Sequence, residues 1–393
     1  MIALTLINNN AVDFTVEICG IKVQLQPRSS DTRMVTVPSE KYMPIQMSSR
    51  QWSTSWLVST GTNLAHEHEF DYPVSNMVNI YQHMEADSAG MLAAMTLNFG
   101  PAFSSQDWMG LLDLSTDPKL GDLTIPGTHN TGTWDATRDS KCQSLNIRQQ
   151  LEYGIRFFDL RLAVSGDDLR IWHGSERQNV YLARDLLPVI KDFLAKHPTE
   201  FVILCVANVS WSINYNQFNS LLGKLLGQGV ATNKLYDGAA MPKVAGMGGV
   251  VALMRQDKEA TFGIMAHDWP DDAKGLVWNP SGQFWYSVQN VYKFGSDYLT
   301  AKWGIIKAQL DCAAKKSDGP AWYANFTSAS RAPITDPIDI ALATDQKGMN
   351  YELHAYLCKQ VGPQYFGTLP MDFPETPSGL IKLLISMNKL KPV

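Results

Sequence analysis

The fold is decided by the stretch Leu120-Gly121-Asp122-Leu123-Thr124-Ile125-Pro126-Gly127-Thr128-His129-Asn130-Thr131. This stretch is a short apolar run that ends at Pro-Gly and is followed at once by a histidine. Two similar runs come next, at residues 154–162 and 169–174, and the second of these also ends in a histidine. Three consecutive strands that each carry a polar group at or near the C-terminal end are typical of the active site of an α/β barrel.

The polar groups of these strands predict a reaction. Asp159 and Arg161 are two apart, so that they share one face of an extended strand. His129 and His173 supply two imidazoles, which suit removal of a proton by one ring and donation of a proton by the other. A guanidinium contacts two phosphate oxygens at once. This set predicts phosphoryl transfer by acid and base, with a carboxylate needed to hold the base in the right tautomer.

The chain from residue 106 to residue 393 alternates between strand and helix patterns. Apolar residues at helical spacing extend from Asn179 to His197, where Pro188 predicts a kink or a later helix start. The apolar run Phe201–Ala207 is typical of a parallel strand covered on both faces. A single α/β barrel is therefore predicted, and the absence of a G-x-G-x-x-G turn disfavours a dinucleotide fold. Further strands are expected at 249–255, 321–328 and 365–372, and further helices at 216–226, 298–312, 336–358 and 377–387.

Residues 1–105 have a different pattern. Short alternating runs recur between Asn, Pro, Ser and Gly clusters, which predicts a small antiparallel β-sandwich as an accessory domain. His66 and His68 could chelate a metal from one strand face, but no third ligand is near, so that a solvated edge strand is favoured. Four aromatic residues suit either a membrane contact or a core: Trp52, Trp56, Phe70 and Tyr72.

Composition and charge exclude several classes of protein. A net charge of -5 gives no basic surface for a nucleic acid. The five cysteines are scattered and odd in number, which favours reduced core residues over a disulfide framework or a metal cage. The N-terminus shows no signal-peptide pattern, and no apolar window approaches the roughly eighteen residues of a membrane span. Any membrane contact is therefore expected to be peripheral.

Three ordered motifs also resemble a known family. Ile125–His129, Arg156–Arg161 and Trp172–Gly174, in this order and spacing, resemble the X region of bacterial phosphatidylinositol-specific phospholipase C. The resemblance extends over roughly residues 108 to 390 and is strongest between 120 and 208. It implies an irregular, incompletely closed TIM barrel, a phosphatidylinositol or glycosyl-phosphatidylinositol substrate at a membrane surface, and a monomer. The family is usually secreted, so that an extracellular location is expected, with the cytoplasm as the alternative.

The resemblance also implies a role for each site residue. His129 would be the general base that takes the proton of the inositol 2-hydroxyl, and His173 the general acid that protonates the diacylglycerol oxygen. Arg161 would clamp the phosphate with Asp159 beside it, and Asp372 would orient the base. The products would be diacylglycerol and inositol 1,2-cyclic phosphate.

Asn130 departs from the pattern of the metal-independent members, which have aspartate there. His-Asn is found in the calcium-dependent relatives, in which Asn130 and Asp159 would be metal ligands. Arg161, however, would place a fixed cation where Ca²⁺ would bind and would repel it. We therefore expect no metal cofactor, with a calcium-dependent phospholipase as the alternative.

The residues that contact the inositol are less clearly marked. Asn208 follows the strand at 201–207, where some relatives have lysines, and can still bind a sugar hydroxyl. Arg255, at the end of the next strand, is expected to supply a compensating contact. Trp278 and Trp285 are candidates for the rim of the site or for stacking under the inositol ring, with the barrel core as an equal alternative.

Two other functions compete with this hypothesis. A glycerophosphodiester hydrolase would use the same barrel, but its metal site needs an E-x-D pattern near the first histidine, and this pattern is missing. A non-catalytic protein that binds lipids or glycans through the β-sandwich would not need the set of His129, Arg161 and His173.

Overall fold

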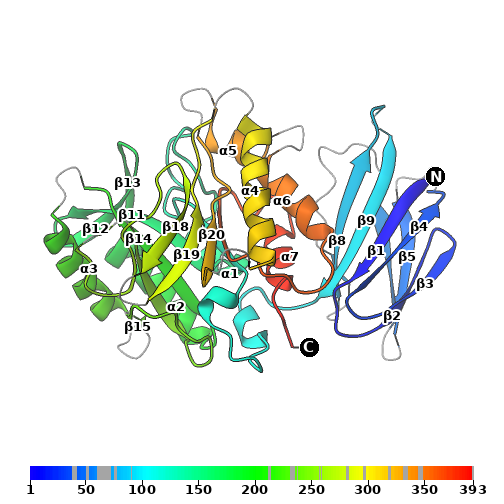
Figure 1. Cartoon of the computed structure of the whole chain (residues 1–393), viewed down its shortest axis with the longest axis horizontal. Helices are drawn as coiled ribbons and strands as arrows, with labels where there is room; N and C mark the ends of the chain where they lie inside the picture. Colours follow the sequence, from blue (N-terminus) through cyan, green and yellow to red (C-terminus); the bar gives the residue numbers. More distant parts are fainter. Residues whose placement is uncertain are drawn as a thin grey trace.

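The computed structural model describes residues 1–391 except 38–41, 50–52, 60–71, 75–77, 90, 211–213, 231–234, 237, 256, 258, 280–282, 295–297, 317–319, 331–334 and 344–347. The histidine pair predicted as an edge strand, His66 and His68, lies outside the described residues, as do Trp52 and Phe70. The chain forms a β-sandwich followed by an α/β barrel (Figure 1). Within the described residues, none of the helices is long and apolar enough to cross a bilayer.

The β-sandwich consists of a five-stranded sheet, in the order β4-β1-β9-β8-β7, and a four-stranded sheet, in the order β3-β2-β5-β6. Burial alternates along the strands, and the inward residues of both sheets form one hydrophobic core. All pairs are antiparallel except β1 with β9, which run parallel. The strands are β1 (Ile2–Asn8), β2 (Phe14–Ile18), β3 (Ile21–Leu25), β4 (Ser29–Val35), β5 (Tyr42–Ser48), β6 (Ser53–Ser59), β7 (Tyr72–Val74), β8 (Val78–Ala86) and β9 (Leu92–Pro101).

The barrel is built on a sheet in the order β15-β16-β14-β11-β10-β21-β20-β19-β18, with β17 beside β16 and the β12–β13 hairpin beside β11. Its central strands are parallel. They contain apolar runs such as residues 201–207 of β14, as expected for strands covered on both faces. The strands are β10 (Ile125–Thr128), β11 (Phe157–Ser165), β12 (Asp168–His173), β13 (Glu176–Tyr181), β14 (Phe201–Asn208), β15 (Leu235–Tyr236), β16 (Gly249–Arg255), β17 (Ile264–Ala266), β18 (Lys274–Asn279), β19 (Phe284–Gln289), β20 (Trp322–Asn325) and β21 (Thr368–Met371).

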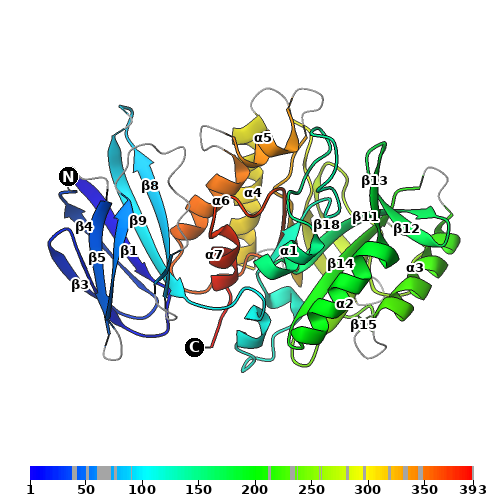
Figure 2. The ribbon, with the colours of Figure 1, turned by 180° about the vertical axis from the view of Figure 1, so that it is seen from behind.

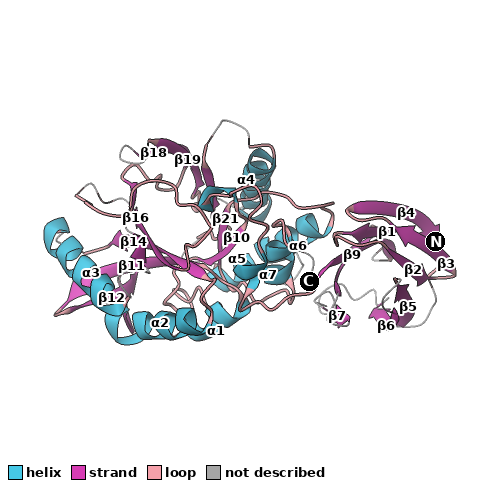
Figure 3. Cartoon of the chain, turned by 90° about the horizontal axis from the view of Figure 1, so that it is seen from below, coloured by secondary structure: helices cyan, strands magenta, loops and turns pink. Residues whose placement is uncertain are grey.

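Helices cover the outside of this sheet in an arc that reaches the β18–β19 hairpin, where α4 contacts β19 (Figure 3). Pro188 stands in the first turn of α2 after a π-helical segment at Leu182–Leu186, so that the predicted later helix start is confirmed. The helices are α1 (Ile147–Tyr153), α2 (Leu187–Lys196), α3 (Tyr215–Gly229), α4 (Tyr298–Ala314), α5 (Pro337–Ala341), α6 (Met349–Cys358) and α7 (Leu380–Ser386).

The β-sandwich packs on the barrel through two of these helices. α6 contacts β8 and β9, and α7 contacts β9 (Figures 1 and 2). Tyr81 of β8 is fully buried and belongs to the hydrophobic core of the barrel rather than to that of the sandwich. The two units therefore share a packed interface, not a bare linker.

A buried ion pair fixes the N-terminal ends of the barrel strands. Arg156, just before β11, donates to Glu200, just before β14, and both side chains are fully buried. The same guanidinium also donates to the carbonyls of Leu151, Ile155 and Gln106, so that its donors are satisfied. Burial raises the pKa of Glu200. The pair is thus a structural anchor at the barrel end.

Replacing one partner of this anchor should cost far more than replacing a surface pair. Arg156→Met leaves Glu200 buried without its cation, and we expect the free energy of unfolding to fall by about 3–5 kcal/mol. Lys196→Ala, which breaks the exposed pair with Asp192, should cost less than about 1 kcal/mol. Denaturant unfolding of the two variants measures both values. Equal losses would contradict the structural role of the buried pair.

Candidate active site

A histidine and an aspartate from neighbouring strands form the centre of the site. β10 and β21 are parallel, with Thr128 opposite Met371, so that the next residue of each strand lies at the same level. These residues are His129 and Asp372, and Nδ1 of the imidazole lies 2.8 Å from Oδ1 of the carboxylate. Because Nδ1 donates its proton to Asp372, Nε2 keeps a lone pair and can act as a base.

The free nitrogen of His129 faces the predicted phosphate clamp. Arg161 donates through Nη2 to Nε2 over 3.0 Å, and the side-chain amide of Asn130 donates to the same atom over 3.1 Å. The side chain of Arg161 is 25% exposed, and its Nε has no partner among the described residues. Arg161 therefore keeps a donor that no described residue uses, which suits an anion bound beside His129.

Asp159 lies behind this guanidinium and is fully buried. Its carboxylate oxygens lie 3.2 Å from Arg255 and 3.6 Å from Arg161, and the backbone N–H of Asn130 donates to it. Burial alone would raise the pKa of Asp159, but the charges of Arg161 and Arg255 outweigh it, so that the pKa is lowered. The group of one carboxylate and two guanidiniums carries a net positive charge, which suits an anionic substrate.

His173 reaches the site by a route that the sequence did not predict. We expected three consecutive parallel strands, but β12 runs antiparallel to β11, with Leu162 opposite Ile171. The C-terminal end of β12 therefore returns toward the level of Asp159 and Arg161. The prediction that this strand ends in a histidine was correct. The prediction that the histidine lies on a neighbouring parallel strand of the barrel was wrong.

The surroundings of His173 disfavour its charged form. Burial, followed by the proximity of His129 and Arg161, lowers the pKa of His173 to about 4, although Glu176 and Asp139 oppose this shift. The two imidazoles and the guanidinium thus act on one another electrostatically, as a shared anion site requires. In the free protein, His173 is neutral at pH 7.

The residues present do not fit a metal ion. The ligand atoms of His129, Cys142 and Asp372 lie within 4.8 Å of one another. The histidine and the carboxylate are, however, hydrogen-bonded to each other, and burial raises the pKa of the Cys142 thiol well above its ordinary value. The alternative calcium ligands, Asn130 and Asp159, fit no better, because the carboxylate of Asp159 already faces two guanidiniums.

The predicted inositol contacts differ in their positions. Asn208, at the end of β14, lies opposite Leu162 of β11, and its amide nitrogen is buried with no partner among the described residues. Arg255, at the end of β16, is 5% exposed, binds Asp159 and stacks over Trp269 and Phe326. Both residues lie at the site end of the barrel, and their contact with a substrate stays a prediction.

Trp278 and Trp285 were assigned to the wrong end of the barrel. They lie opposite each other in the antiparallel β18–β19 hairpin, with ring centroids 5.0 Å apart. Trp285 stands near the start of β19, four residues or roughly 13 Å before Gln289 at the end that faces the site. The prediction that these rings form the rim of the site is therefore wrong. Trp285 is 48% exposed, so that it does not belong to the core either.

Two residues that the sequence analysis did not single out follow β19 at the correct end. Asn290 and Tyr292 come after Gln289, and the carbonyl of Tyr292 accepts a hydrogen bond from Ser330 beyond the end of β20. Tyr292 is partly exposed. Their position directly after a parallel strand is the signal that could have revealed them.

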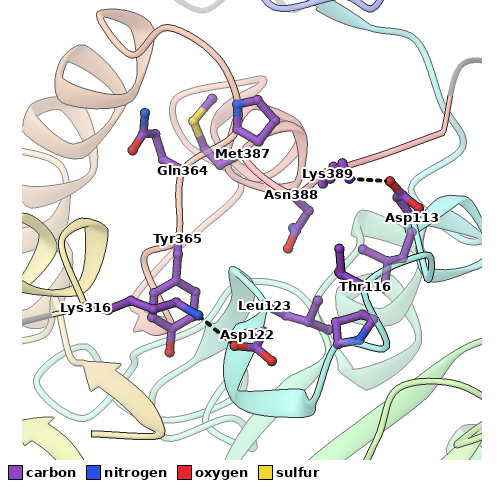
Figure 4. Close-up of a pocket in the computed structure, with 13 residues that line it drawn as sticks. Asp113, Thr116, Asp122, Leu123, Lys316, Gln364, Tyr365, Met387, Asn388 and Lys389 are labelled. Atoms are coloured by element: carbon purple, nitrogen blue, oxygen red, sulfur yellow. Dashed lines mark hydrogen bonds and ion pairs between the residues drawn. The ribbon is translucent and has the colours of Figure 1, made fainter. Parts of the chain in front are cut away.

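One cavity lies away from this site. It has a volume of about 430 Å³ and lies near the N-terminal ends of β10 and β21, between two ion pairs, Lys316–Asp122 and Lys389–Asp113 (Figure 4). Tyr365 and Leu123 lie on its walls. None of the residues predicted for catalysis lines it.

Comparisons with known proteins agree with this geometry. The family model described as phosphatidylinositol-specific phospholipase C, X domain, matches residues 117–254. A 1-phosphatidylinositol phosphodiesterase of Listeria monocytogenes is 37% identical over 297 residues, which cover 73% of this chain and 86% of that protein. A protein of the same name from Staphylococcus aureus is 27% identical over 250 residues, which cover 58% of this chain and 76% of that protein.

Solved structures with the same fold include a phosphatidylinositol-specific phospholipase C from Staphylococcus aureus. It superposes with a TM-score of 0.61 at 22% identity and covers 73% of this chain and 98% of that chain. The irregular TIM barrel expected from the sequence is therefore confirmed.

An anion in the site should change the protonation of His173. Negative charge near the ring stabilises the imidazolium, so that saturating inorganic phosphate should raise the pKa of His173 from about 4 toward the ordinary value. NMR titration of the histidine side chains, with and without phosphate, measures the shift. Arg161→Met should also raise the pKa of His173 by removing a neighbouring cation. If His173 of the free protein titrated with the ordinary pKa of a histidine, this result would contradict the effect of its surroundings.

Proposed function

The chain belongs to the phosphatidylinositol-specific phospholipase C family, and from that premise we propose how its residues cleave the lipid. The substrate is a phosphatidylinositol lipid, and the bond broken joins the phosphate to diacylglycerol. The observation that carries the proposal is the position of His129, which is bound to Asp372 through one nitrogen and faces Arg161 with the other.

His129 acts as the general base of the first step. Asp372 holds the Nδ1 proton, so that Nε2 takes the proton of the inositol 2-hydroxyl, and the hydroxyl oxygen forms a bond to phosphorus. Arg161 donates to the same Nε2 in the free protein, which supports a phosphate position beside the base. When the phosphate binds, the guanidinium contacts its oxygens instead of Nε2, and the inositol hydroxyl then displaces Asn130, the other donor to this nitrogen.

His173 acts as the general acid. It is neutral in the free protein because burial, His129 and Arg161 lower its pKa. The negative charge of the bound phosphodiester favours protonation of the ring, and the proton then goes to the departing diacylglycerol oxygen. The bond from phosphorus to that oxygen breaks, which gives diacylglycerol and inositol 1,2-cyclic phosphate. Water can open the ring in a slower step in which the two histidines exchange roles.

Asp159 and Arg255 support the clamp from behind. Asp159 restrains Arg161 in the direction of His129, and Arg255 offsets the buried charge of Asp159. We assign the inositol contacts to Asn208 and to Tyr292, the partly exposed aromatic residue after β19. Arg255 can contact the inositol only by leaving Asp159. We therefore assign Arg255 to the support of Arg161 and Asp159.

We assign catalysis to residues 106–393 and an accessory role to residues 1–105. The reaction needs no metal ion in this proposal, because two guanidiniums occupy the place of a divalent cation beside Asp159. A monomer that acts on phosphatidylinositol or its glycosylated forms at a membrane surface, outside the cell, is the arrangement that the family resemblance implies.

Replacing either imidazole should abolish lipid cleavage. A positioned acid or base contributes about 10²–10⁴-fold, so that His129→Ala and His173→Ala should each lower kcat by that factor. Release of diacylglycerol from phosphatidylinositol vesicles measures the loss. Trp285→Ala, at the other end of the barrel, should keep kcat within about twofold of the native value. A fully active His129→Ala variant would overturn the assignment.

Chelation of divalent cations should leave the reaction intact. With phosphatidylinositol vesicles as substrate, excess EDTA should change kcat/KM by less than about twofold, because the charge at the phosphate is neutralised by Arg161. Arg161→Ala should lower kcat/KM by more than about a hundredfold under the same conditions. Loss of activity in EDTA with recovery on addition of Ca²⁺ would instead favour the calcium-dependent alternative.

A further inference from the structure

The helix α6 is held at its C-terminal end by the β-sandwich. The last carbonyls of an α-helix lack partners within the helix and need donors from elsewhere. Here Asn98 of β9 donates through Nδ2 to the carbonyl of Cys358 over 3.0 Å, and to that of Gln360 over 3.3 Å. Asn9, just after β1, donates to the carbonyl of Gln360 over 3.1 Å. Two asparagines of the sandwich thus supply the C-terminal cap of a barrel helix.

This contact is buried and internally connected. Asn98 is fully buried and Asn9 is 8% exposed. The amide of Asn9 also donates to Oδ1 of Asn98 over 3.0 Å, and Oδ1 of Asn9 accepts from the backbone N–H of Gly362 over 2.6 Å. The bond from Asn98 to the carbonyl of Cys358 is buried, so that removal of this donor leaves a buried carbonyl unsatisfied, whereas the carbonyl of Gln360 accepts from both asparagines.

The N-terminal end of the same helix holds the turn that carries Asp372. Asn350, in the first turn of α6, is fully buried. Its Nδ2 lies 2.9 Å from the carbonyl oxygens of Asp372, Phe373 and Thr376. Phe373 has a φ of 46°, a left-handed conformation that is unfavourable for a bulky side chain and that the surroundings must maintain.

We propose that Asn350 is a positioning residue for the base His129, and that α6 makes the β-sandwich part of its support. The path has three contacts: Asn9 and Asn98 hold the C-terminal end of α6, Asn350 holds the backbone of Asp372, and Asp372 holds His129. Figures 1 and 2 show α6 lying between the sandwich and the barrel. The expected loss of kcat rests on the proposed function. The expected change in the hydrogen bond between Asp372 and His129 does not.

Asn350→Ala tests the barrel side of this path. Loss of the amide frees the turn, Asp372 shifts relative to His129, and kcat should fall between about tenfold and a hundredfold. KM should change by less than about twofold, because no substrate contact is removed. The native protein should show a deshielded Nδ1 proton of His129 by NMR, and this signal should weaken or disappear in the variant. An unchanged kcat and an unchanged proton signal in this variant would overturn the role of Asn350.

Asn98→Ala and Asn8→Ala test the sandwich side as a matched pair. Both side chains are fully buried asparagines that donate to backbone carbonyls. Those of Asn8 belong to Val12, Leu25 and Gln26, within the sandwich itself. Asn98→Ala should lower kcat at least about threefold and weaken the His129 proton signal, whereas Asn8→Ala should leave both unchanged.

Equal effects of Asn98→Ala and Asn8→Ala, or no effect of Asn98→Ala, would overturn the role of the sandwich. If Asn98→Ala does not fold, Asn9→Ala, at the edge of the joint, takes its place with the same expectations. The proton signal separates the inference from the proposed function. If the native protein had no lipase activity, the proposed function would be refuted. The response of the His129 proton signal to Asn350→Ala and Asn98→Ala would still test whether α6 and the sandwich position His129.

Discussion

The hydrogen bond between His129 and Asp372 is the constraint on which the rest of the site depends. The two residues are 243 positions apart, and they meet only because β10 and β21 are neighbours in the sheet. The bond fixes the tautomer of the imidazole and aims Nε2 at Arg161. Further along the sheet, β11 carries Asp159 and Arg161, and β16 ends in Arg255. Arg161 contacts that nitrogen, and Asp159 and Arg255 lie behind Arg161. The parallel register of these strands thus brings their polar residues together in one cluster.

The charges of this cluster balance in a way that favours an anion. A single guanidinium near His129 would be free to swing into solvent, and a single buried carboxylate would oppose a phosphate. Asp159 between Arg161 and Arg255 avoids both outcomes, because it restrains one cation and is neutralised by the other. Asn130 adds a hydrogen bond to His129 without adding charge, so that the positive potential at the phosphate position is kept.

The sequence predicted the barrel and the polar residues on or directly after its parallel strands. His129 and Asp372 directly follow β10 and β21, and Asp159 and Arg161 lie within β11. Trp285 was misplaced because it stands near the start of β19, although this strand runs parallel to β20. The prediction for His173 failed because the strand direction reverses: β12 is antiparallel to β11, so that His173 arrives from the opposite direction. A pattern of apolar residues has the same period in either direction and cannot distinguish them.

Contacts such as those of Asn350 and Asn98 could not be predicted, because an asparagine in a helix or strand carries no signal for a distant carbonyl. The pairing of β10 with β21 has a consequence for the synthesis of the protein. β10 leaves the ribosome long before β21, so that a nascent chain has its histidine 243 positions before it has the aspartate. A chain that stops short of β21 therefore lacks the carboxylate that orients the imidazole.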